Sequence, residues 1–330
     1  MRIAVVEGDG IGREVIPVAR DILAMLRPDF EFYPVSAGLS VWKEMGRGIS
    51  DEGLAALRDA DAVLFGAVTT PPSPEYRSVV VQIRKELDLF ANIRPVRGPD
   101  VDLVIVRENT EGLYSGIEEI GEDRATTLRV LTRKGCERIA RFGCRLAGER
   151  RRLTIGHKAN VLKSDAFFRE ICLAEATAAG IDWDERYIDA LCLEVLQRPG
   201  AFDVILTTNL FGDILSDVAA YLVGGLGLLP SANIGDSNAL FEPVHGSAPD
   251  IAGRGIADPI AAIRSAAMLL AYTGNHVQSA LVEEGIVRTL ARGIKTRDLG
   301  GTASTREFGA AVSREIECLI REGTNRGHSL

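Results

Sequence analysis

The segment Thr207–Asp217, TTNLFGDILSD, carries the side chains whose types and spacing most clearly suggest chemistry. Asp213 and Asp217 are four residues apart, so they share one face of the helix that the segment predicts, with Asn209 as its N-terminal cap. Two negative charges at this spacing repel each other, and a hard divalent cation with oxygen ligands would remove the repulsion. A solvated acidic face is the alternative. The apolar neighbours of the two aspartates favour a metal site.

Three arginines, Arg84, Arg94 and Arg107, lie next to apolar or β-rich segments instead of in charged loops. A planar guanidinium group can bind a carboxylate through two parallel hydrogen bonds. Any one of the three alone would more often be a surface ion-pair partner. Together they predict a site for a di- or tricarboxylate, provided that the fold brings them together.

A loop of small residues, Glu242–Gly253, could approach a flat ligand closely. Asp250 could accept hydrogen bonds from ribose hydroxyls, and its charge would repel the 2′-phosphate of NADP. Taken alone, the segment slightly favours a structural loop that holds His245 in a hydrogen bond. The sequence GDGIG at 8–12 has the spacing G-x-G-x-G, not the Rossmann G-x-G-x-x-G, so a glycine turn explains it at least as well as phosphate binding.

These residues are set among short β-rich segments that alternate with longer amphipathic ones, a pattern that predicts an α/β protein with a largely parallel sheet. The predicted strand and helix pairs are 3–6 with 15–26, 62–65 with 79–89, 103–106 with 134–147, and 204–207 with 210–223. A chain of 330 residues is long enough for two lobes. The turn-forming segments 224–227 and 98–100 are the best candidates for crossings between them.

The composition argues against several classes of protein. Hydrophobic residues make up 46% and charged residues 25% of the chain, as in ordinary globular proteins, and no apolar run reaches the roughly 18 residues of a membrane span. A net charge of −8 disfavours nucleic acid as a partner. The N-terminus lacks the features of a signal peptide, and the five cysteines form no disulfide or zinc pattern. We therefore expect a cytoplasmic protein without a membrane partner.

Six motifs in order along the chain resemble the isocitrate, isopropylmalate and homoisocitrate dehydrogenase family. They are GDGIG at 8–12, RENTEGLY at 107–114, HKANVLK at 157–163, TTNLFGDILSD at 207–217, GLGLLPSANIGD at 225–236 and EPVHGSAPDIAG at 242–253. The resemblance implies an α/β, isopropylmalate dehydrogenase-like fold, not a Rossmann fold, with an active-site cleft between two lobes. Residues 1–90 and 224–330 would form the large cofactor-side lobe. Residues 91–223 would form the small metal-binding lobe, which pairs two chains in a homodimer, with a tetramer left open.

The resemblance also implies the reaction, which is oxidative decarboxylation of a 3-substituted malate with NAD and with Mg²⁺ or Mn²⁺. Tyr114 would be the acid, and Lys158 of the partner subunit would be the base. Metal binding is implied for Asp213 and Asp217, together with Asp189 of the partner subunit. The implied substrate-binding residues are Arg77, Ser78, Arg84, Arg94 and Arg107. The implied cofactor-binding residues are Glu242, His245, Gly246, Ala248, Asp250, Ile251 and Asp258.

The choice among malates depends on the segment 76–84. Arg77 and Ser78 can hydrogen-bond a distal carboxylate, as in isocitrate-type relatives, whereas Val79–Val81 offer an apolar wall that suits a longer methylene spacer. The pattern of this segment resembles archaeal homoisocitrate dehydrogenases most closely, so homoisocitrate and its chain-length homologues rank first, 3-isopropylmalate second and isocitrate third, with a role in amino-acid biosynthesis. Position 258 departs from the pattern, since relatives resembling this chain usually have asparagine there and this chain has Asp258. An asparagine can both donate and accept hydrogen bonds, whereas an aspartate can only accept them, so the change affects the expected contact with adenine.

Two alternatives belong to other classes of protein. A catalytically silent regulatory subunit would lack a metal aspartate, the tyrosine or the lysine, and all of these are present. A non-catalytic carboxylate-binding module would leave the paired aspartates unexplained.

Overall fold

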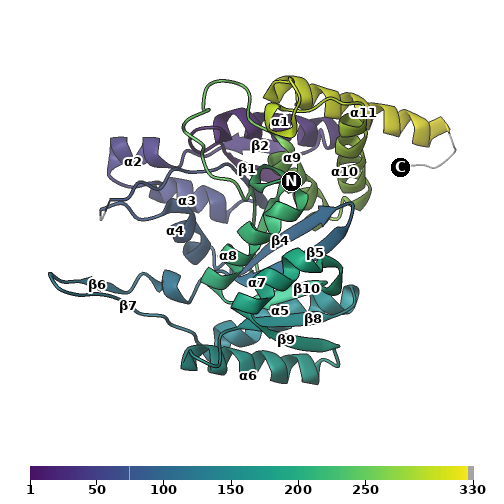
Figure 1. Cartoon of the computed structure of the whole chain (residues 1–330). Helices are drawn as coiled ribbons and strands as arrows, with labels where there is room; N and C mark the ends of the chain where they lie inside the picture. The colour runs from purple at the N-terminus through teal and green to yellow at the C-terminus, as the bar shows by residue number, and fades with distance from the viewer. Residues whose placement is uncertain (74, 326–330) are drawn as a thin grey trace. The chain divides into compact units, whose positions relative to one another are not determined.

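The computed structural model describes residues 1–73 and 75–325, and the chain divides into two compact units. Unit 1 comprises Met1–Ile83, Leu226–Ala232 and Asn238–Leu330, and unit 2 comprises Arg84–Gly225 and Asn233–Ser237. Both combine strands with helices, so the predicted α/β class is confirmed (Figure 1). The chain leaves unit 2 after Gly225, within one of the two predicted crossing segments. The prediction for 98–100 was wrong, because this segment lies at the turn between two strands of unit 2.

Unit 1 is built on parallel strands in the order β2-β1-β3-β12, followed by β11, whose last two residues belong to unit 2. Their bounds are Arg2–Val6 (β1), Glu31–Pro34 (β2), Ala62–Phe65 (β3), Pro230–Ile234 (β11) and Ala239–Pro243 (β12). β1 and β3 are short and rich in apolar residues, and all four residues of β3 are buried, whereas the edge strand β2 has no buried residue. Parallel strands are buried on both faces by the helices that connect them, which explains this continuous apolar pattern.

The helices of unit 1 pack their apolar faces on this framework. Their bounds are Gly12–Leu26 (α1), Leu39–Met45 (α2), Asp51–Arg58 (α3), Ile260–Tyr272 (α9), His276–Ala291 (α10) and Thr305–Asn325 (α11). In α1, Val15, Ile16, Ala19 and Leu23 recur at helical spacing and are fully buried. α9 packs against both α1 and α10.

Unit 2 contains five further strands in the order β4-β5-β10-β8-β9. Their bounds are Ala91–Gly98 (β4), Val101–Glu108 (β5), Leu153–His157 (β8), Trp183–Tyr187 (β9) and Val204–Thr207 (β10). β4 and β5 are antiparallel, whereas β5, β10, β8 and β9 pair in parallel, so the prediction of a largely parallel sheet is correct except for this pair. The tight turn at Gly98–Val101 allows only an antiparallel connection.

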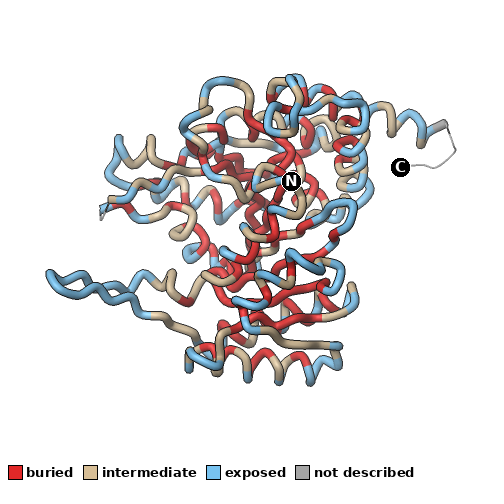
Figure 2. Tube along the Cα trace, in the orientation of Figure 1, coloured by how far each residue is buried: buried red, intermediate tan, exposed pale blue. Residues whose placement is uncertain are grey.

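The helices of unit 2 are α5 (Arg133–Glu149), α6 (Lys163–Ala178), α7 (Ile188–Gln197) and α8 (Asn209–Ala220), and α4 (Val79–Glu86) extends across the boundary between the units. β5, β8 and β10 are almost wholly buried, whereas the separate hairpin of β6 (Glu118–Ile120) and β7 (Ala125–Thr127) is exposed (Figure 2). Short 3₁₀ helices lie at Leu113–Ser115, Pro199–Ala201, Tyr221–Val223, Leu226–Leu228 and Arg297–Leu299.

The five cysteines all lie within the described residues and are free thiols, as expected from their scattered positions. Cys136, Cys144 and Cys172 belong to the hydrophobic core of unit 2, between its helices and strands. Burial raises the pKa of each of these thiols, so they remain protonated packing residues. In the part of the chain that the structure describes, no helix combines the length and the apolar character needed to cross a membrane.

Candidate active site

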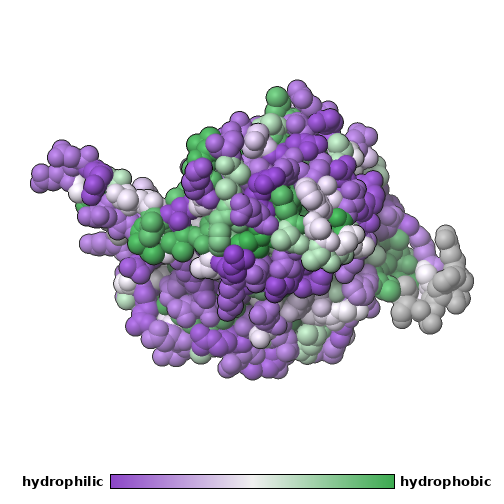
Figure 3. All heavy atoms as spheres, turned by 90° about the horizontal axis from the view of Figure 1, so that it is seen from below, coloured by the Kyte–Doolittle hydropathy of each residue, from purple (hydrophilic) through white to green (hydrophobic). Residues whose placement is uncertain are grey.

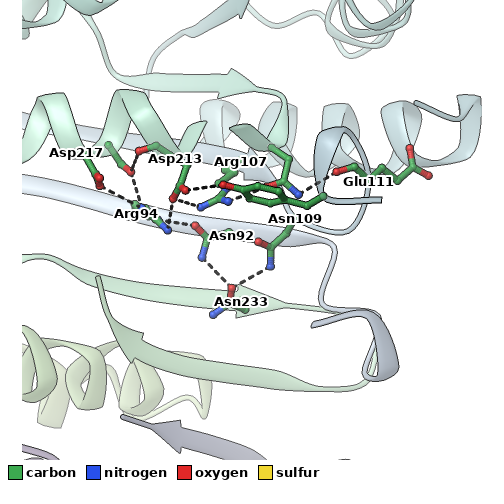
Figure 4. Close-up of polar contacts among 11 residues, drawn as sticks. Asn92, Arg94, Arg107, Asn109, Glu111, Asp213, Asp217 and Asn233 are labelled. Atoms are coloured by element: carbon green, nitrogen blue, oxygen red, sulfur yellow. Dashed lines mark hydrogen bonds and ion pairs between the residues drawn. The ribbon is translucent and has the colours of Figure 1, made fainter. Parts of the chain in front are cut away.

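Asp213 and Asp217 of α8 face two buried arginines from the neighbouring strands (Figure 4). Arg107 of β5 pairs through Nη1 with Asp213, and Arg94 of β4 places Nη2 3.2 Å from the same carboxylate. Nη1 of Arg94 lies 3.8 Å from Asp217. Arg94 is 5% exposed and Arg107 is 1% exposed. The predicted metal aspartates and two of the predicted carboxylate-binding arginines thus form one cluster in unit 2.

The strand register and one glycine position this cluster. β4 and β5 pair Asn92 with Arg107, and Arg94 is two residues further along β4, on the same face. At Gly212 of α8, an added Cβ atom would lie only 2.7 Å from the Cβ and Cγ atoms of Arg107. Glycine therefore lets α8 approach β5 closely enough for Asp213 to reach the guanidinium group.

Asn209 does not cap α8 with its side chain, so that prediction was wrong. α8 begins at Asn209 itself and has Thr208 as its N-cap residue. The Asn209 side-chain oxygen instead accepts hydrogen bonds from Arg107, with Nε at 3.1 Å and Nη2 at 2.7 Å, while its amide group donates to the carbonyl of Glu111 at 3.0 Å. A buried guanidinium group needs acceptors for its N–H groups, and this demand outweighs local helix capping.

Three asparagines and a serine that sequence inspection missed hold Arg94 in place (Figure 4). Arg94 donates from Nε to Asn92 at 2.7 Å and from Nη1 to Ser216 at 2.6 Å. Asn92 and Asn109 both donate to the side-chain oxygen of Asn233, each at 2.9 Å. The only local signal is the spacing of Asn92 and Arg94 on one strand face, whereas Asn233 is remote in sequence.

The charges of the cluster shift the pKa values of its members. Burial opposes ionisation of Asp213, but Arg107 and Arg94 outweigh burial and lower its pKa below the usual value. Burial and the charge of Asp213 raise the pKa of Asp217. Burial and Asp213 also raise the pKa of Tyr114, whose hydroxyl donates to Asp213 at 3.1 Å. Tyr114 therefore keeps its proton and can supply it to a substrate atom.

Arg84, at the end of α4, is 6% exposed. Its positive charge contributes to the lowered pKa of Asp213 and acts on Tyr114 and Arg107 as well. The three arginines that were predicted to bind carboxylates thus act on the same aspartate in unit 2.

Lys158 and Asp189 form a separate pair in unit 2. Nζ of Lys158 lies 2.6 Å from Asp189 Oδ1 and 5.8 Å from the centre of the Tyr187 ring. Among the described residues, no hydrogen bond or ion pair connects either of them to Asp213 or Asp217. The structure therefore does not bring these two predicted residues to the aspartates of their own chain.

The predicted cofactor loop belongs to unit 1. His245 bonds through Nδ1 to the carbonyl of Gly246 at 2.9 Å, so Nδ1 carries the proton and Nε2 is an acceptor. Nε2 is buried and has no hydrogen-bond partner within the described residues, and burial lowers the pKa of His245. Ala248 has a positive φ of 39°, and the N–H of Ile251 closes a turn on its carbonyl at 3.1 Å. Asp250 is exposed in this turn.

Two other cofactor candidates precede this turn in the chain. Gly246 has open space where a Cβ would be, so a ligand can approach its backbone. Glu242 is buried on β12. The glycine turn at 8–12 packs on the same loop, because Ile11 donates to the carbonyl of Ser247 at 2.9 Å and a Cβ on Gly10 would lie 1.9 Å from that oxygen. The structure thus gives this glycine a packing role.

Arg77 and Ser78, the predicted specificity residues, precede α4 in unit 1. Arg77 is exposed and Ser78 is half-buried. Of the predicted apolar wall, Val79 is fully buried, and its Cγ2 atom occupies the space where a Cβ on Gly48 would lie. Val79 therefore packs inside unit 1, and only the half-buried Val80 and Val81 could contact a substrate.

A model of the isocitrate/isopropylmalate dehydrogenase family matches residues 2–312. The chain belongs to this family. It is an oxidoreductase, a β-decarboxylating dehydrogenase, and dehydrogenases of this family generally use NAD or NADP and a divalent metal ion. The predicted family and fold class are therefore confirmed.

Three similar proteins differ in the substrates that their names give. A 3-isopropylmalate/3-methylmalate dehydrogenase of Methanocaldococcus jannaschii is 47% identical, with 96% of this chain and 98% of the relative covered. A homoisocitrate dehydrogenase of the same organism is 44% identical, with 97% and 99% covered. The crystal structure of isocitrate dehydrogenase from Methylococcus capsulatus superimposes with a TM-score of 0.92 at 40% identity, with 96% of this chain and 99% of that chain covered.

The residues of this dehydrogenase fit a divalent cation at α8. Asp213 and Asp217 offer carboxylate oxygens, the ligands that hard cations prefer, and a cation would relieve the mutual repulsion that contributes to the raised pKa of Asp217. Within the described residues, no group of three His, Cys, Asp or Glu side chains could hold a metal ion. The two aspartates would need ligands from outside this set.

Asp258, a predicted cofactor-binding residue, has an internal role in unit 1. Its carboxylate oxygens accept hydrogen bonds from the N–H of Ile260 at 2.8 Å and the hydroxyl of Thr296 at 2.9 Å. Asp258 is 7% exposed. Burial, assisted by the charge of Asp298, raises the pKa of Asp258 to about 6. Both oxygens are thus already engaged within unit 1.

We predict that Asp258→Asn stabilises the dehydrogenase at pH 7.5 by up to about 2 kcal/mol. The folded-state pKa of about 6 lies above the unfolded value, so the carboxyl destabilises the fold as pH rises from about 4 through about 6. Asparagine stays neutral, and its amide can bond the same two groups. Urea denaturation at pH 7.5 and pH 4.5 measures the difference, which should be small at the lower pH. A variant that is less stable at pH 7.5 would contradict this prediction.

Proposed function

We propose that this dehydrogenase converts a 3-substituted malate into a 2-oxo acid and carbon dioxide with NAD⁺, and that homoisocitrate and its chain-length homologues are the preferred substrates. The observation that carries the proposal is the cluster of Arg94, Arg107, Asp213 and Tyr114. It combines cations for carboxylates, oxygen ligands for a metal and a protonated acid. These are the groups that decarboxylation next to an oxidised carbon requires.

The side chains divide the work of the reaction. Arg84, Arg94 and Arg107 would hold the carboxylates of the substrate, and Lys158 of the partner subunit would accept the proton of the 2-hydroxyl group. When bound, the divalent cation supplies Lewis-acid stabilisation of negative charge on the substrate oxygens, and NAD⁺ accepts the hydride. After carbon dioxide has left, Tyr114 would donate its proton to carbon 3, and its raised pKa means that the hydroxyl still carries this proton at neutral pH.

The preference for a longer substrate rests on residues of unit 1. Arg77 is exposed and could pair with a distal carboxylate, while Val80 and Val81 could line a methylene spacer. The names of the relatives include isopropylmalate, methylmalate, homoisocitrate and isocitrate enzymes, so they support the class of substrate without selecting one member.

The preference for NAD⁺ rests on Asp250. Its carboxylate is exposed on the turn that follows His245, whose unpartnered Nε2 supports a ligand site there. A negative charge at this turn would repel the 2′-phosphate of NADP⁺ and accept hydrogen bonds from the ribose hydroxyls of NAD⁺.

Steady-state kinetics with homoisocitrate, 3-isopropylmalate and isocitrate, each with NAD⁺ and NADP⁺, would test the proposal. We expect the highest kcat/KM for homoisocitrate, at least about 10-fold higher with NAD⁺ than with NADP⁺. Chelation should stop turnover, and Mg²⁺ or Mn²⁺ should restore it. An equal or higher kcat/KM with NADP⁺ would contradict the role of Asp250. A higher value for 3-isopropylmalate would contradict the substrate assignment.

We further propose that two chains form a homodimer through unit 2, so that Asp189 and Lys158 reach the site of the neighbouring subunit. Unit 2 exposes large apolar side chains on α7 and α8, namely Leu193, Leu196 and Ile214. Hydrophobic side chains also gather beside the projecting hairpin of β6 and β7 on the face seen from below (Figures 1 and 3). Exposed apolar surface of this kind favours association. A partner would also supply the further ligand that Asp213 and Asp217 lack among the described residues of one chain.

A further inference from the structure

We infer that Asp165 is a positioning residue for Lys158, an inference that rests on the proposed role of Lys158 as the base. Asp165 lies in the first turn of α6 and is fully buried. Its Oδ2 atom accepts the backbone N–H of Lys158 at 2.7 Å, and its Oδ1 atom accepts a hydrogen bond from Arg129 at 2.5 Å. A buried carboxylate is thus used to hold the main chain at the predicted base.

The backbone of Lys158 is fixed on both sides. Its N–H is held by Asp165, and its carbonyl accepts the N–H groups of Val161 at 3.0 Å and Leu162 at 2.9 Å. The side chain therefore extends from a fixed turn at the end of β8 toward Asp189. Because Nζ is four carbons beyond Cα, a small rotation of this turn would move the amine by a larger distance. Accurate placement of a proton acceptor is a large part of its effect on rate.

Arg129 connects this turn to the start of the metal-binding helix. It donates to Asp165, to the Ser164 hydroxyl at 2.9 Å and to the Thr208 hydroxyl at 3.1 Å, and it lies 5.3 Å from the ring centre of Phe211. Thr208 directly precedes α8. The ion pair therefore fixes the Lys158 turn against the element that carries Asp213 and Asp217, although no bond joins Lys158 to these aspartates.

Asp203 provides a matched control. It is 1% exposed, pairs with Arg150 at 2.6 Å and accepts the backbone N–H of Arg152 at 3.2 Å. Asp203 precedes β10, whereas Thr208 and α8 follow the opposite end of that strand. It thus reproduces the burial, the arginine partner and the backbone hydrogen bond of Asp165, without holding a predicted catalytic residue.

The kinetic test compares Asp165→Asn with Asp203→Asn in the full-length enzyme loaded with Mg²⁺ and NAD⁺, at a temperature where circular dichroism shows both to be folded. Asp165→Asn should lower kcat roughly 100-fold and change the substrate KM by less than about 3-fold, whereas Asp203→Asn should keep kcat within about 2-fold. Equal kcat values in the two variants would overturn the inference. If Asp165→Asn does not fold, Arg129→Lys replaces it, and its kcat should be about 10-fold lower than that of the native enzyme. A native kcat in Arg129→Lys would also overturn the inference.

Heterodimers then show which site the change affects. If Asp165 acts through Lys158, a chain with Asp165→Asn should regain activity when paired with an Asp213→Asn chain, and should show no more than its own residual activity when paired with a Lys158→Ala chain. The opposite pattern would overturn the inference, because it would assign Asp165 to the site of its own chain. If Lys158→Ala and Asp213→Asn fail to complement each other, the shared site of the proposed function is wrong, and the kinetic comparison with Asp203→Asn alone decides the role of Asp165.

Discussion

Replacing Asp213 by asparagine is expected to lower kcat by roughly 1,000-fold or more. The change removes a negative oxygen from the only carboxylate that contacts Arg94, Arg107 and Tyr114 together in the described chain. Kinetics at increasing Mg²⁺ and Mn²⁺ concentrations would measure the loss. Near-native activity without a raised metal requirement would contradict the assignment of this residue to the metal.

The same variant has an expected pH signature in stability. The pKa of Asp213 is lower in the folded protein than in the unfolded chain, so its ion pair stabilises the fold above the unfolded pKa of about 3.9 and is lost as pH falls through the folded value. Asp213→Asn should therefore cost about 2 kcal/mol at pH 7, discounted because the side chain is 35% exposed, and progressively less as pH falls below the unfolded pKa toward the lowered folded pKa. Metal-free urea denaturation would separate this cost from the loss of catalysis.

Mixing two inactive chains is expected to restore activity. Lys158→Ala and Asp213→Asn chains, refolded together, should form heterodimers in which one site collects both changes and the other has none. The intact site should give about half of the native activity per heterodimer, as two symmetric sites require. Heterodimers can be isolated with two different affinity tags before the assay.

The outcome of this mixing has only one structural explanation. Among the described residues no hydrogen bond or ion pair joins Lys158 or Asp189 directly to Asp213, and only a site that takes its lysine from the other chain is intact in the heterodimer, so recovery requires Lys158 to act across the dimer. If each chain uses its own lysine, every site in the mixture keeps one change. Isolated heterodimers without activity would then refute the shared site and leave the roles of Tyr114 and the metal aspartates unaffected.

The sequence predicts those parts of the fold that depend on local pattern. Strands such as β3 and β10 and helices such as α1 and α8 were located because their apolar residues recur at the spacing of one element. The aspartates of α8 could be placed on one helix face for the same reason. The segment 98–100 was misassigned because a tight turn between strands and a lobe crossing use the same residue types.

The remaining parts of the site depend on contacts between distant segments. Asn209 has the residue type of a helix cap, and only the burial of Arg107 shows why its side chain bonds elsewhere. Asp165 and Arg129 are 36 positions apart, and neither belongs to a pattern that predicts an ion pair. The apolar run Val79–Val81 suggests a substrate wall, yet packing against Gly48 takes its first member into the interior.

Asn233 has a consequence for the order in which the protein is made. It belongs to a five-residue stretch of unit 2, Asn233–Ser237, that lies in the chain between two stretches of unit 1. During synthesis, residues 84–225 leave the ribosome before this stretch, so Asn92 and Asn109 cannot yet have Asn233 as their acceptor. Asn92, which accepts a hydrogen bond from Arg94, is therefore held by Asn233 only after translation has passed residue 233. A fragment that ends at Gly225 would lack Asn233 and its hydrogen bonds to Asn92 and Asn109.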